Sequence, residues 1–388
     1  MPDVHARFSP SSADRRIHCP PSLLLEEESG MPDTGSAYSQ EGTEAHALGE
    51  FLLKTALGEE TSDPRPEFKY YSDEMQSCAE GYRDEVLAIY EQVKTECSDA
   101  LISIEQRVSF TDYVEEGFGT SDAIILGGGH LYVIDYKHGK GVPVYAEGDG
   151  DGNAQLKCYA LGAYLAFDAL YEIKEITLVV YQPRISNYSK YTLSSKDLVE
   201  WAENTLKPAA EMALHGEGDY SSGAWCRFCK AKAVCRKRAE ENLALARYDF
   251  ARPPVLEDDE VNVILSKING LVAWAEDIRA YALGRALTGY SWDDWKVVEG
   301  RANRRFTDEE KVAEKVSASG FDPYTRKLRP LTEMEKLLGK KQFNDLLGDL
   351  VEKPTGKQTL VSRTDPRPEM NNIMNDFSME ETNYGEKE

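Results

Sequence analysis

At 388 residues the chain is longer than one average domain, so we expect a main domain and a sizeable second region. With 41% hydrophobic and 29% charged residues, its composition is that of a globular protein with a large buried core, which excludes a chain that is disordered throughout. The formal net charge of −23 excludes a protein that coats nucleic acid nonspecifically over its whole surface, although it permits a local binding groove.

The spacing of apolar residues changes between helical and strand periodicity along the first half of the chain. Residues 42–57 repeat apolar side chains at helical spacing, and His46 lies on this helix. The further elements, in chain order, are a helix from about 73 to 97, strands at 102–110, 120–126 and 131–137, a helix over 154–170 and a buried strand over 176–182. This order predicts an α/β fold in which helices flank a mixed central sheet.

A change in composition marks a domain boundary in the second half of the chain. Arg252-Pro253-Pro254 and the acidic residues after it interrupt the helical pattern. The sequence therefore predicts a main domain over 1–249 and a helical C-terminal region over 250–372. Residues 373–388 are polar with few apolar anchors, so we expect a disordered tail there.

The start of the chain and its cysteine content indicate the cellular compartment. No apolar run approaches the length that spans a bilayer, and residues 1–16 are polar and charged. We therefore expect a cytoplasmic protein with no membrane partner. Seven cysteines without a secretion signal favour reduced thiols and metal ligation over a disulfide framework.

Three glycines at 127–129 separate the second and third predicted strands and favour a tight hairpin. With Gly128 and Gly129 as a two-residue loop, counting outward along both strands brings Asp122 opposite Asp135. Side chains directly opposite each other lie about 4.5 to 5.5 Å apart at Cβ, a separation that one divalent cation can bridge. The hairpin therefore predicts a pair of carboxylates suited to a shared cation.

Lys137 points to the same face as Asp135, because side chains alternate along a strand. An ammonium group beside a metal-binding carboxylate pair is a layout suited to hydrolysis. The structural alternative is that Asp122 merely begins a strand and that Lys137 neutralises a solvated Asp135 at a sheet edge. Asp135 interrupts an otherwise apolar strand, which favours the metal site.

These residues resemble the PD-(D/E)XK nuclease superfamily. Asp122 and Asp135-Tyr136-Lys137 match its two-part motif, with Ser121 where the motif has proline. Gly42-Thr-Glu-Ala-His46 resembles the helical histidine motif of the RecB, AddB and CRISPR-associated exonuclease branch, and Gln155-Leu-Lys-Cys-Tyr159 resembles its Gln-x-x-x-Tyr motif. The resemblance covers roughly residues 5 to 240 and implies a restriction-endonuclease-like core, in what is expected to be a phage member of the branch.

The resemblance also implies roles for individual residues. Lys137 would position or activate the attacking water, and Gln155 and Tyr159, four apart on one helix face, could hold the DNA backbone or the site geometry. The alternative for Gln155 and Tyr159 is ordinary helix surface and core. The alternative for His46 is a histidine that is merely packed or exposed. The groups implied to bind Mg²⁺ or Mn²⁺ are His46, Asp122, Asp135 and the backbone carbonyl of Tyr136.

Three cysteines in the short segment Cys226-Arg-Phe-Cys229 to Cys235 have a spacing typical of metal ligation. Cys19, far upstream, completes a set of four that resembles the iron-sulfur exonucleases, which implies a [4Fe-4S] cluster clasping the two ends of the domain. Four thiolates also suit tetrahedral zinc, and spacing does not distinguish the two. The structural alternative is that these four cysteines are reduced and bind no metal. The remaining three, Cys78, Cys97 and Cys158, fit that description.

The function that the resemblance implies is a DNA exonuclease, or an end-processing nuclease, acting in recombination or repair, with DNA and a recombination protein as partners. The alternatives are a non-catalytic DNA-binding or structural iron-sulfur protein on a nuclease fold, and a zinc-binding interaction module. Because DNA must approach an acidic protein, we expect a local basic strip, and the C-terminal group of its candidates could equally be a solvated face. Its candidates are Lys137, Lys140 and Lys157 near the site, and Arg301, Arg304, Arg305, Lys340 and Lys341 from the C-terminal region.

Overall fold

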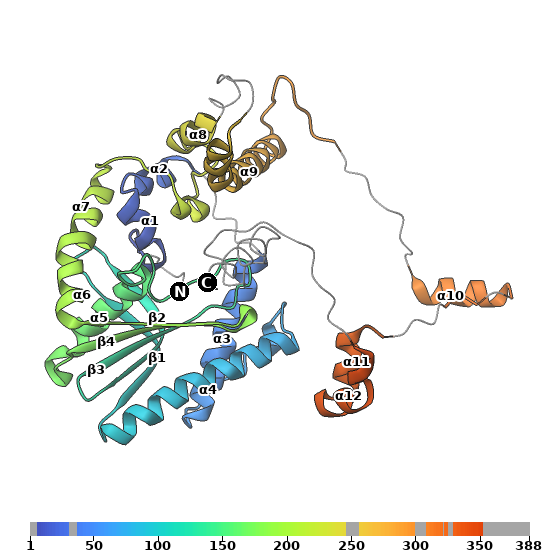
Figure 1. The fold of residues 1–388 in the computed structure, drawn as a ribbon, viewed down its shortest axis with the longest axis horizontal. Helices are drawn as coiled ribbons and strands as arrows, with labels where there is room; N and C mark the ends of the chain where they lie inside the picture. The colour runs from blue at the N-terminus through green and yellow to red at the C-terminus, as the bar shows by residue number, and fades with distance from the viewer. Residues whose placement is uncertain are drawn as a thin grey trace, which may run out of the picture. The chain divides into compact units, whose positions relative to one another are not determined.

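The computed structural model describes residues 6–30, 37–245, 256–298, 308–320, 322–324 and 329–351. The chain divides into two compact units, Met1–Val298 and Glu299–Glu388. The first unit contains a sheet with helices around it, and the described part of the second is helical (Figure 1). No described helix is both long and apolar enough to cross a membrane.

A five-stranded mixed sheet forms the centre of the first unit. Its strands lie in chain order, and only β3 and β4 are parallel to each other. The predicted α/β class with a mixed central sheet is therefore confirmed. The strands are β1 (Leu101–Ser109), β2 (Phe118–Gly127), β3 (His130–Tyr136), β4 (Glu175–Gln182) and β5 (Asn187–Ser194).

Helices cover both faces of the sheet, and each face has its own apolar core. Helices α3 (Ala37–Ala56) and α4 (Asp73–Glu96) pack on one face, and α5 (Ala154–Tyr171), which connects β3 to β4, packs on the other (Figure 1). Along β3, Leu131 and Val133 belong to the α5 core, whereas Ile134 and Tyr136 belong to the α3–α4 core. Side-chain alternation thus buries this strand on both faces.

The β2–β3 hairpin has the predicted turn. Gly128 and Gly129 have φ angles of 62° and 78°, the left-handed conformation that glycine adopts without steric cost. Gly127 pairs with His130, and the register continues to Ala123 opposite Ile134. The predicted register is confirmed, so the next position along the ladder brings Asp122 beside Asp135.

Helices at the start of the chain and after β5 complete the first unit. The N-terminal segment forms α1 (Ala13–His18) and α2 (Ser22–Glu28), and the chain after β5 continues as α6 (Ser195–Trp201), α7 (Lys207–His215), α8 (Arg236–Leu243) and α9 (Asp258–Leu287). Arg238 of α8 forms an ion pair with Asp277 of α9 at 2.6 Å. Both helices belong to the first unit, which extends to Val298. The boundary that the sequence predicts at residue 249 lies outside the described residues.

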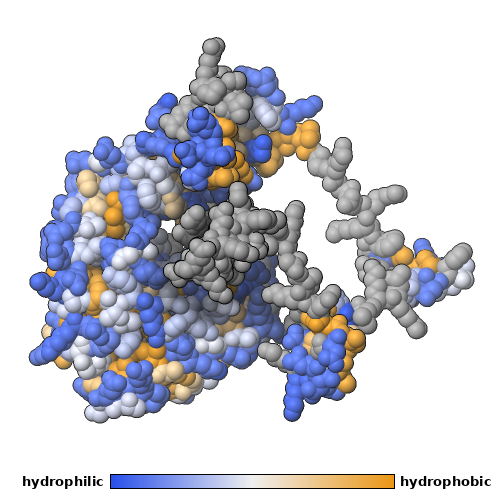
Figure 2. Space-filling model, in the orientation of Figure 1, coloured by the Kyte–Doolittle hydropathy of each residue, from blue (hydrophilic) through white to orange (hydrophobic). Residues whose placement is uncertain are grey.

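The helical region predicted over 250–372 therefore belongs to both units. In the second unit the described helices are α10 (Glu309–Ala318), α11 (Leu331–Leu338) and α12 (Lys340–Leu347). The predicted tail over 373–388 lies outside the described residues. Apolar side chains reach the surface along α9, among them Leu265, Val272, Leu283 and Leu287, and orange patches mark such surface apolar residues in Figure 2.

A buried ion-pair network joins the N-terminal helices to the segment that follows α7. Arg16 of α1 and Glu26 of α2 pair at 2.6 Å, and both are more than nine-tenths buried. The other carboxylate oxygen of Glu26 accepts a hydrogen bond from the backbone N–H of Lys230, and Arg15 lies 3.3 Å from it. Burial acts to raise the pKa of Glu26, but Arg16 and Arg15 more than offset it, so the net pKa is lowered.

We expect Glu26→Ala to lower the free energy of unfolding by about 3 kcal/mol, because it leaves the Arg16 guanidinium buried without its partner. Urea denaturation at pH 7 measures this loss. Glu27→Ala is the matched control: Glu27 pairs with Arg7 on the surface, so its loss should cost less than about 1 kcal/mol. Equal losses in the two variants would contradict the network's role.

The stabilising effect of Glu26 should depend on pH. Its folded pKa lies below its ordinary value of 4.5, so its contribution is present above pH 4.5 and is lost as pH falls through the folded pKa. The difference in unfolding free energy between wild type and Glu26→Ala should therefore shrink in urea titrations repeated at decreasing pH. A difference that stays constant down to pH 2 would contradict this assignment.

Candidate functional site

Three carboxylates occupy one row across β1, β2 and β3. The β1–β2 ladder pairs Ile104 with Ala123 and Gln106 with Ser121, so Glu105 lies opposite Asp122. The β2–β3 register places Asp135 on the other side of Asp122. The row therefore contains the two predicted aspartates and a glutamate on the neighbouring strand.

Glu105 lies at the point in β1 where the side-chain alternation relative to the two cores is shifted. Ile102 and Ile104 pack with the α3–α4 core, but Val108, an even number of positions further on, packs with the α5 core. Glu105 has a φ of 49°, a left-handed conformation that non-glycine residues rarely adopt. Because of this local backbone conformation, the residues after Glu105 direct their side chains to the opposite faces from those that the pattern before it predicts.

Asp122 contacts a different group with each carboxylate oxygen. Its Oδ1 lies 3.2 Å from Nδ1 of His46 on α3, and its Oδ2 accepts a hydrogen bond of 2.7 Å from the backbone N–H of Tyr136. Ligand atoms of His46, Glu105 and Asp122 all lie within 4.8 Å of one another. The structure thus brings together an imidazole and two carboxylates that could hold one metal ion.

The approach of α3 to the sheet depends on Gly49, which lies one turn beyond His46. A Cβ at this position would lie 3.0 Å from the ring of Tyr82, tighter than ordinary packing. The ring of Tyr82 stacks on that of Tyr136, with centroids 4.8 Å apart. The absence of a side chain at Gly49 therefore lets the helix place His46 against Asp122.

Asp135 is directed toward Lys137 in the structure. Its Oδ2 lies 2.9 Å from the Lys137 ammonium, which also donates a hydrogen bond to Oε1 of Gln155 at 3.4 Å. Gln155 in turn donates to the hydroxyl of Tyr159, 3.1 Å away and one turn along α5. Lys137 is therefore held between β3 and α5 with its charge at the carboxylate row.

The charges of this site influence one another strongly. Burial raises the pKa of Asp135, Lys137 opposes this effect, and the negative charge of Asp122 adds to it, so the net pKa is raised. Burial also acts to raise the pKa of Asp122, but His46 and Lys137 hold it below its ordinary value. Burial and the charge of Asp122 raise the pKa of Glu105 to about 7. Since a divalent cation would relieve this repulsion, the row is suited to bind one.

Lys137 carries its proton at neutral pH. Burial acts to lower the pKa of its ammonium group, but Asp135 and Asp122 raise it further, so the net pKa lies above its ordinary value. The group can therefore donate hydrogen bonds and supply positive charge, whereas taking up a proton is excluded while it stays charged.

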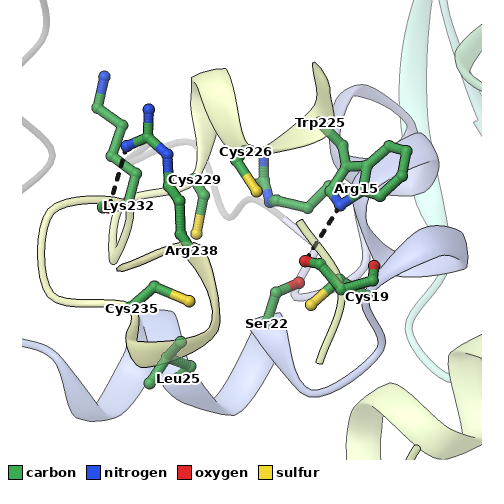
Figure 3. Close-up of a pocket in the computed structure, with 11 residues that line it drawn as sticks. Arg15, Cys19, Ser22, Leu25, Trp225, Cys226, Cys229, Lys232, Cys235 and Arg238 are labelled. Atoms are coloured by element: carbon green, nitrogen blue, oxygen red, sulfur yellow. Dashed lines mark hydrogen bonds between the residues drawn. The ribbon is translucent and has the colours of Figure 1, made fainter. Parts of the chain in front are cut away.

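Four cysteines line a single pocket between the N-terminal helices and the segment that precedes α8. Cys19 follows α1, Cys226 and Cys229 lie in the loop after α7, and Cys235 directly precedes α8. Figure 3 shows their sulfur atoms turned toward a common space. All four thiols are free, so no disulfide competes for them.

The four thiols are spread more widely than a single tetrahedral ion requires. A zinc ion with Zn–S bonds of about 2.3 Å would hold its sulfurs roughly 3.8 Å apart. Among the described residues, no three of these sulfur atoms lie within 4.8 Å of one another. The pocket is therefore more open than a closed zinc site.

Positively charged side chains surround the thiols. Arg15, Lys232 and Arg238 line the same pocket (Figure 3). Burial is the main cause that raises the pKa of Cys229 to about 12, and it also raises the pKa of Cys19. Both thiols are thus protonated unless a metal draws off the protons. Arg15 pairs with Glu26, and Lys232 and Arg238 both pair with Asp277.

A family model described as "Protein of unknown function (DUF2800)" matches residues 5–368. The chain belongs to the DUF2800 family. One solved structure, "Crystal structure of SSO0001", matches 51% of this chain and 98% of its own length at 16% sequence identity. Its TM-score of 0.23 is too low to support an argument about this DUF2800 protein.

The structure of the DUF2800 protein brings most of the predicted site residues together. Seven of them meet at the carboxylate row and the helices beside it: His46, Asp122, Asp135, Tyr136, Lys137, Gln155 and Tyr159. The other four, Cys19, Cys226, Cys229 and Cys235, form the separate thiol pocket.

Glu105 is the site residue that the sequence reasoning missed. Polar residues surround it in β1, where Ser103 precedes it and Gln106 and Arg107 follow it, so it does not stand out as Asp135 does in β3. Its register opposite Asp122 could not be predicted either, because the connection between β1 and β2 is longer than a tight turn and does not fix the pairing.

Lys157 does not belong to a basic strip near the site, so that part of the prediction is wrong. Its side chain is 2% exposed, its ammonium group lies 3.0 Å from Asp151, and it lies over the ring of Trp201. Lys157 therefore stabilises the protein interior and is not available to DNA, whereas Lys140 is exposed. Arg301, Arg304 and Arg305 lie outside the described residues, and Lys340 and Lys341 begin α12 in the second unit.

Proposed function

We propose that this DUF2800 protein is a DNA nuclease of the PD-(D/E)XK type that depends on a divalent cation. The single observation that supports it most is the contact between Asp122 and the backbone N–H of Tyr136, which sets Asp122 beside Asp135 and Lys137. The predicted motif residues are therefore neighbours in space, although they are separated along the sequence.

The ligand set suits the proposed ion. Carboxylates and a backbone carbonyl favour Mg²⁺ and Mn²⁺, and an imidazole favours Mn²⁺ over Mg²⁺. The proposed ligands are His46, Asp122, Asp135 and the carbonyl of Tyr136. When bound, the cation would polarise the scissile phosphate and lower the pKa of the attacking water.

The chain's own residues would provide the remaining chemistry. The Lys137 ammonium, which stays protonated between Asp135 and Asp122, would hold the attacking water or stabilise the negative charge that develops on the phosphate. Gln155 restrains Lys137 through a hydrogen bond, and Tyr159 restrains Gln155. These two residues would therefore keep the charge of Lys137 aligned with the substrate.

We extend the proposal to the substrate and the biological role. The resemblance implies digestion of DNA from its ends during recombination or repair, with a recombination protein as a partner. The acidic composition means that DNA must be held locally, and exposed Lys140 is a described residue suited to contact its phosphates.

We also propose that Cys19, Cys226, Cys229 and Cys235 hold a [4Fe-4S] cluster. The separation of their sulfurs supports a group larger than a single zinc ion, since no three of these sulfurs lie within 4.8 Å of one another among the described residues. The cluster would connect the segment after α1 to the segment before α8, and so hold the N-terminal helices on the domain.

Purified protein incubated with Mn²⁺ and end-labelled linear DNA, single- and double-stranded, should degrade the DNA, and gel analysis of the label shows the direction of digestion. Asp135→Asn should lower the rate at least about 100-fold, because it removes a charged ligand without changing the size of the side chain. Asp84→Asn, on the exposed surface of α4, should leave the rate unchanged.

Failure of the wild type to cleave any of these substrates, or cleavage that is equal in Asp135→Asn, would contradict the nuclease proposal. Retained DNA binding without cleavage would then favour the alternative of a non-catalytic DNA-binding protein on a nuclease fold.

The protein purified without oxygen should be brown and contain about four iron and four sulfide ions per chain. Cys229→Ser should lose most of this iron, whereas Cys78→Ser, on α4 and remote from the pocket, should retain it. Metal analysis and the visible absorption spectrum measure both. A colourless wild type with one zinc per chain would contradict the cluster assignment.

A further inference from the structure

We propose that α9 is the interface of a homodimer, in which the helix packs antiparallel against the α9 of a second copy of the chain. The partner that covers this surface is therefore an identical chain. This inference goes beyond the proposed nuclease function and does not depend on it.

A stripe of exposed apolar side chains runs along α9. Helical periodicity places Val261, Leu265, Ile268 and Val272 on one side of the helix, and Leu283 continues the same side. All five are exposed, and more than half of the surface of Val272 and of Leu283 is accessible. A surface helix normally turns such a stripe toward a core, so an exposed stripe indicates a surface that binds a partner.

The stripe faces away from the helix that holds α9 on the first unit. Helix α8 contacts α9 at Asp277, which pairs with Arg238, and near Gly270, where a Cβ would lie 3.9 Å from Asn242. Gly270 and Asp277 are roughly half a helical turn away from the stripe. Within this unit α9 lies at the end remote from the sheet (Figure 1). The described packing of α9 therefore leaves the stripe open.

Two opposite charges interrupt the stripe between Val272 and Leu283. Glu276 and Arg279 lie on the same side of the helix as the apolar residues, and both are exposed. Among the described residues, neither forms an ion pair. The stripe thus contains one acid and one base that lack a charged partner, with apolar residues on both sides.

This order of charges makes the stripe complementary to itself when the second helix runs in the opposite direction. A two-fold axis midway between Glu276 and Arg279 places the acid of each copy level with the base of the other. Two ion pairs form in this way. A parallel pair would instead bring each charge beside the same charge of the second copy, which disfavours that arrangement.

The register that pairs these charges also matches the apolar residues. It sets Val272 level with Leu283 of the second copy, and Ile268 level with Leu287 of the second copy. All four residue types are apolar and exposed in the single chain. Because one register satisfies the ion pairs and the apolar contacts together, a second copy suits this surface.

The test is the mass of the purified full-length protein in solution, measured by sedimentation equilibrium. A reducing buffer prevents disulfides between the free cysteines of two copies. At micromolar concentration the wild type should have twice the chain mass of 43.5 kDa. Dilution then gives the dissociation constant of the dimer.

Reversal of the charges tests the antiparallel register. Arg279→Glu should weaken the dimer at least about tenfold, because each Glu276 would then face a glutamate. Adding Glu276→Arg to this variant restores two ion pairs in reversed order, and should return the dissociation constant to within about threefold of the wild type. Lys267→Glu is the matched control, since it makes the same charge change on an exposed position of α9 outside the stripe, and it should leave the dimer unchanged.

A wild type with the mass of one chain at all these concentrations would overturn the proposal, and the partner of the stripe would then be another surface. A dimer that Arg279→Glu weakens no more than Lys267→Glu does, or that the folded double variant fails to recover, would overturn the α9 interface. Circular dichroism shows that each variant keeps its helices. The mass of the wild type decides the first point without relying on any variant.

Discussion

The mutual repulsion of three neighbouring carboxylates is the constraint on which the functional part of this molecule depends. Glu105, Asp122 and Asp135 lie in one row of the sheet, and burial makes their charges costly. His46 and Lys137 offset part of this cost from opposite ends. Stability alone would favour apolar residues at these positions, and the proposed cation would supply the positive charge that the row lacks.

The scaffold around the row serves to hold these charges in place. The glycine turn sets the register of β2 against β3, and the missing side chain at Gly49 lets α3 come close to the sheet. On the other face, α5 presents Gln155 to Lys137. Because each of these elements is buried in one of the two cores, the charged groups have little freedom to move apart.

Much of this arrangement could be predicted from the sequence, and the exceptions have physical reasons. The hairpin register followed from the paired glycines, because a two-residue turn leaves one way to count. Glu105 could not be placed, because a left-handed glutamate is not indicated by residue type. The burial of Lys157 was missed because its aromatic partner, Trp201, lies in α6, a helix that the apolar pattern did not predict. The grouping of Cys226, Cys229 and Cys235 followed from their spacing, whereas the addition of Cys19 followed only from a family resemblance.

The joining of the chain's beginning to Cys235 has a consequence for biosynthesis. Cys19 leaves the ribosome long before its three partners, and Arg16 likewise waits for the loop that contains Lys230 to complete the pocket around Glu26. The N-terminal helices can already pack on α5, so what is completed last, once residues 226–235 have been made, is the thiol pocket and the surroundings of Glu26.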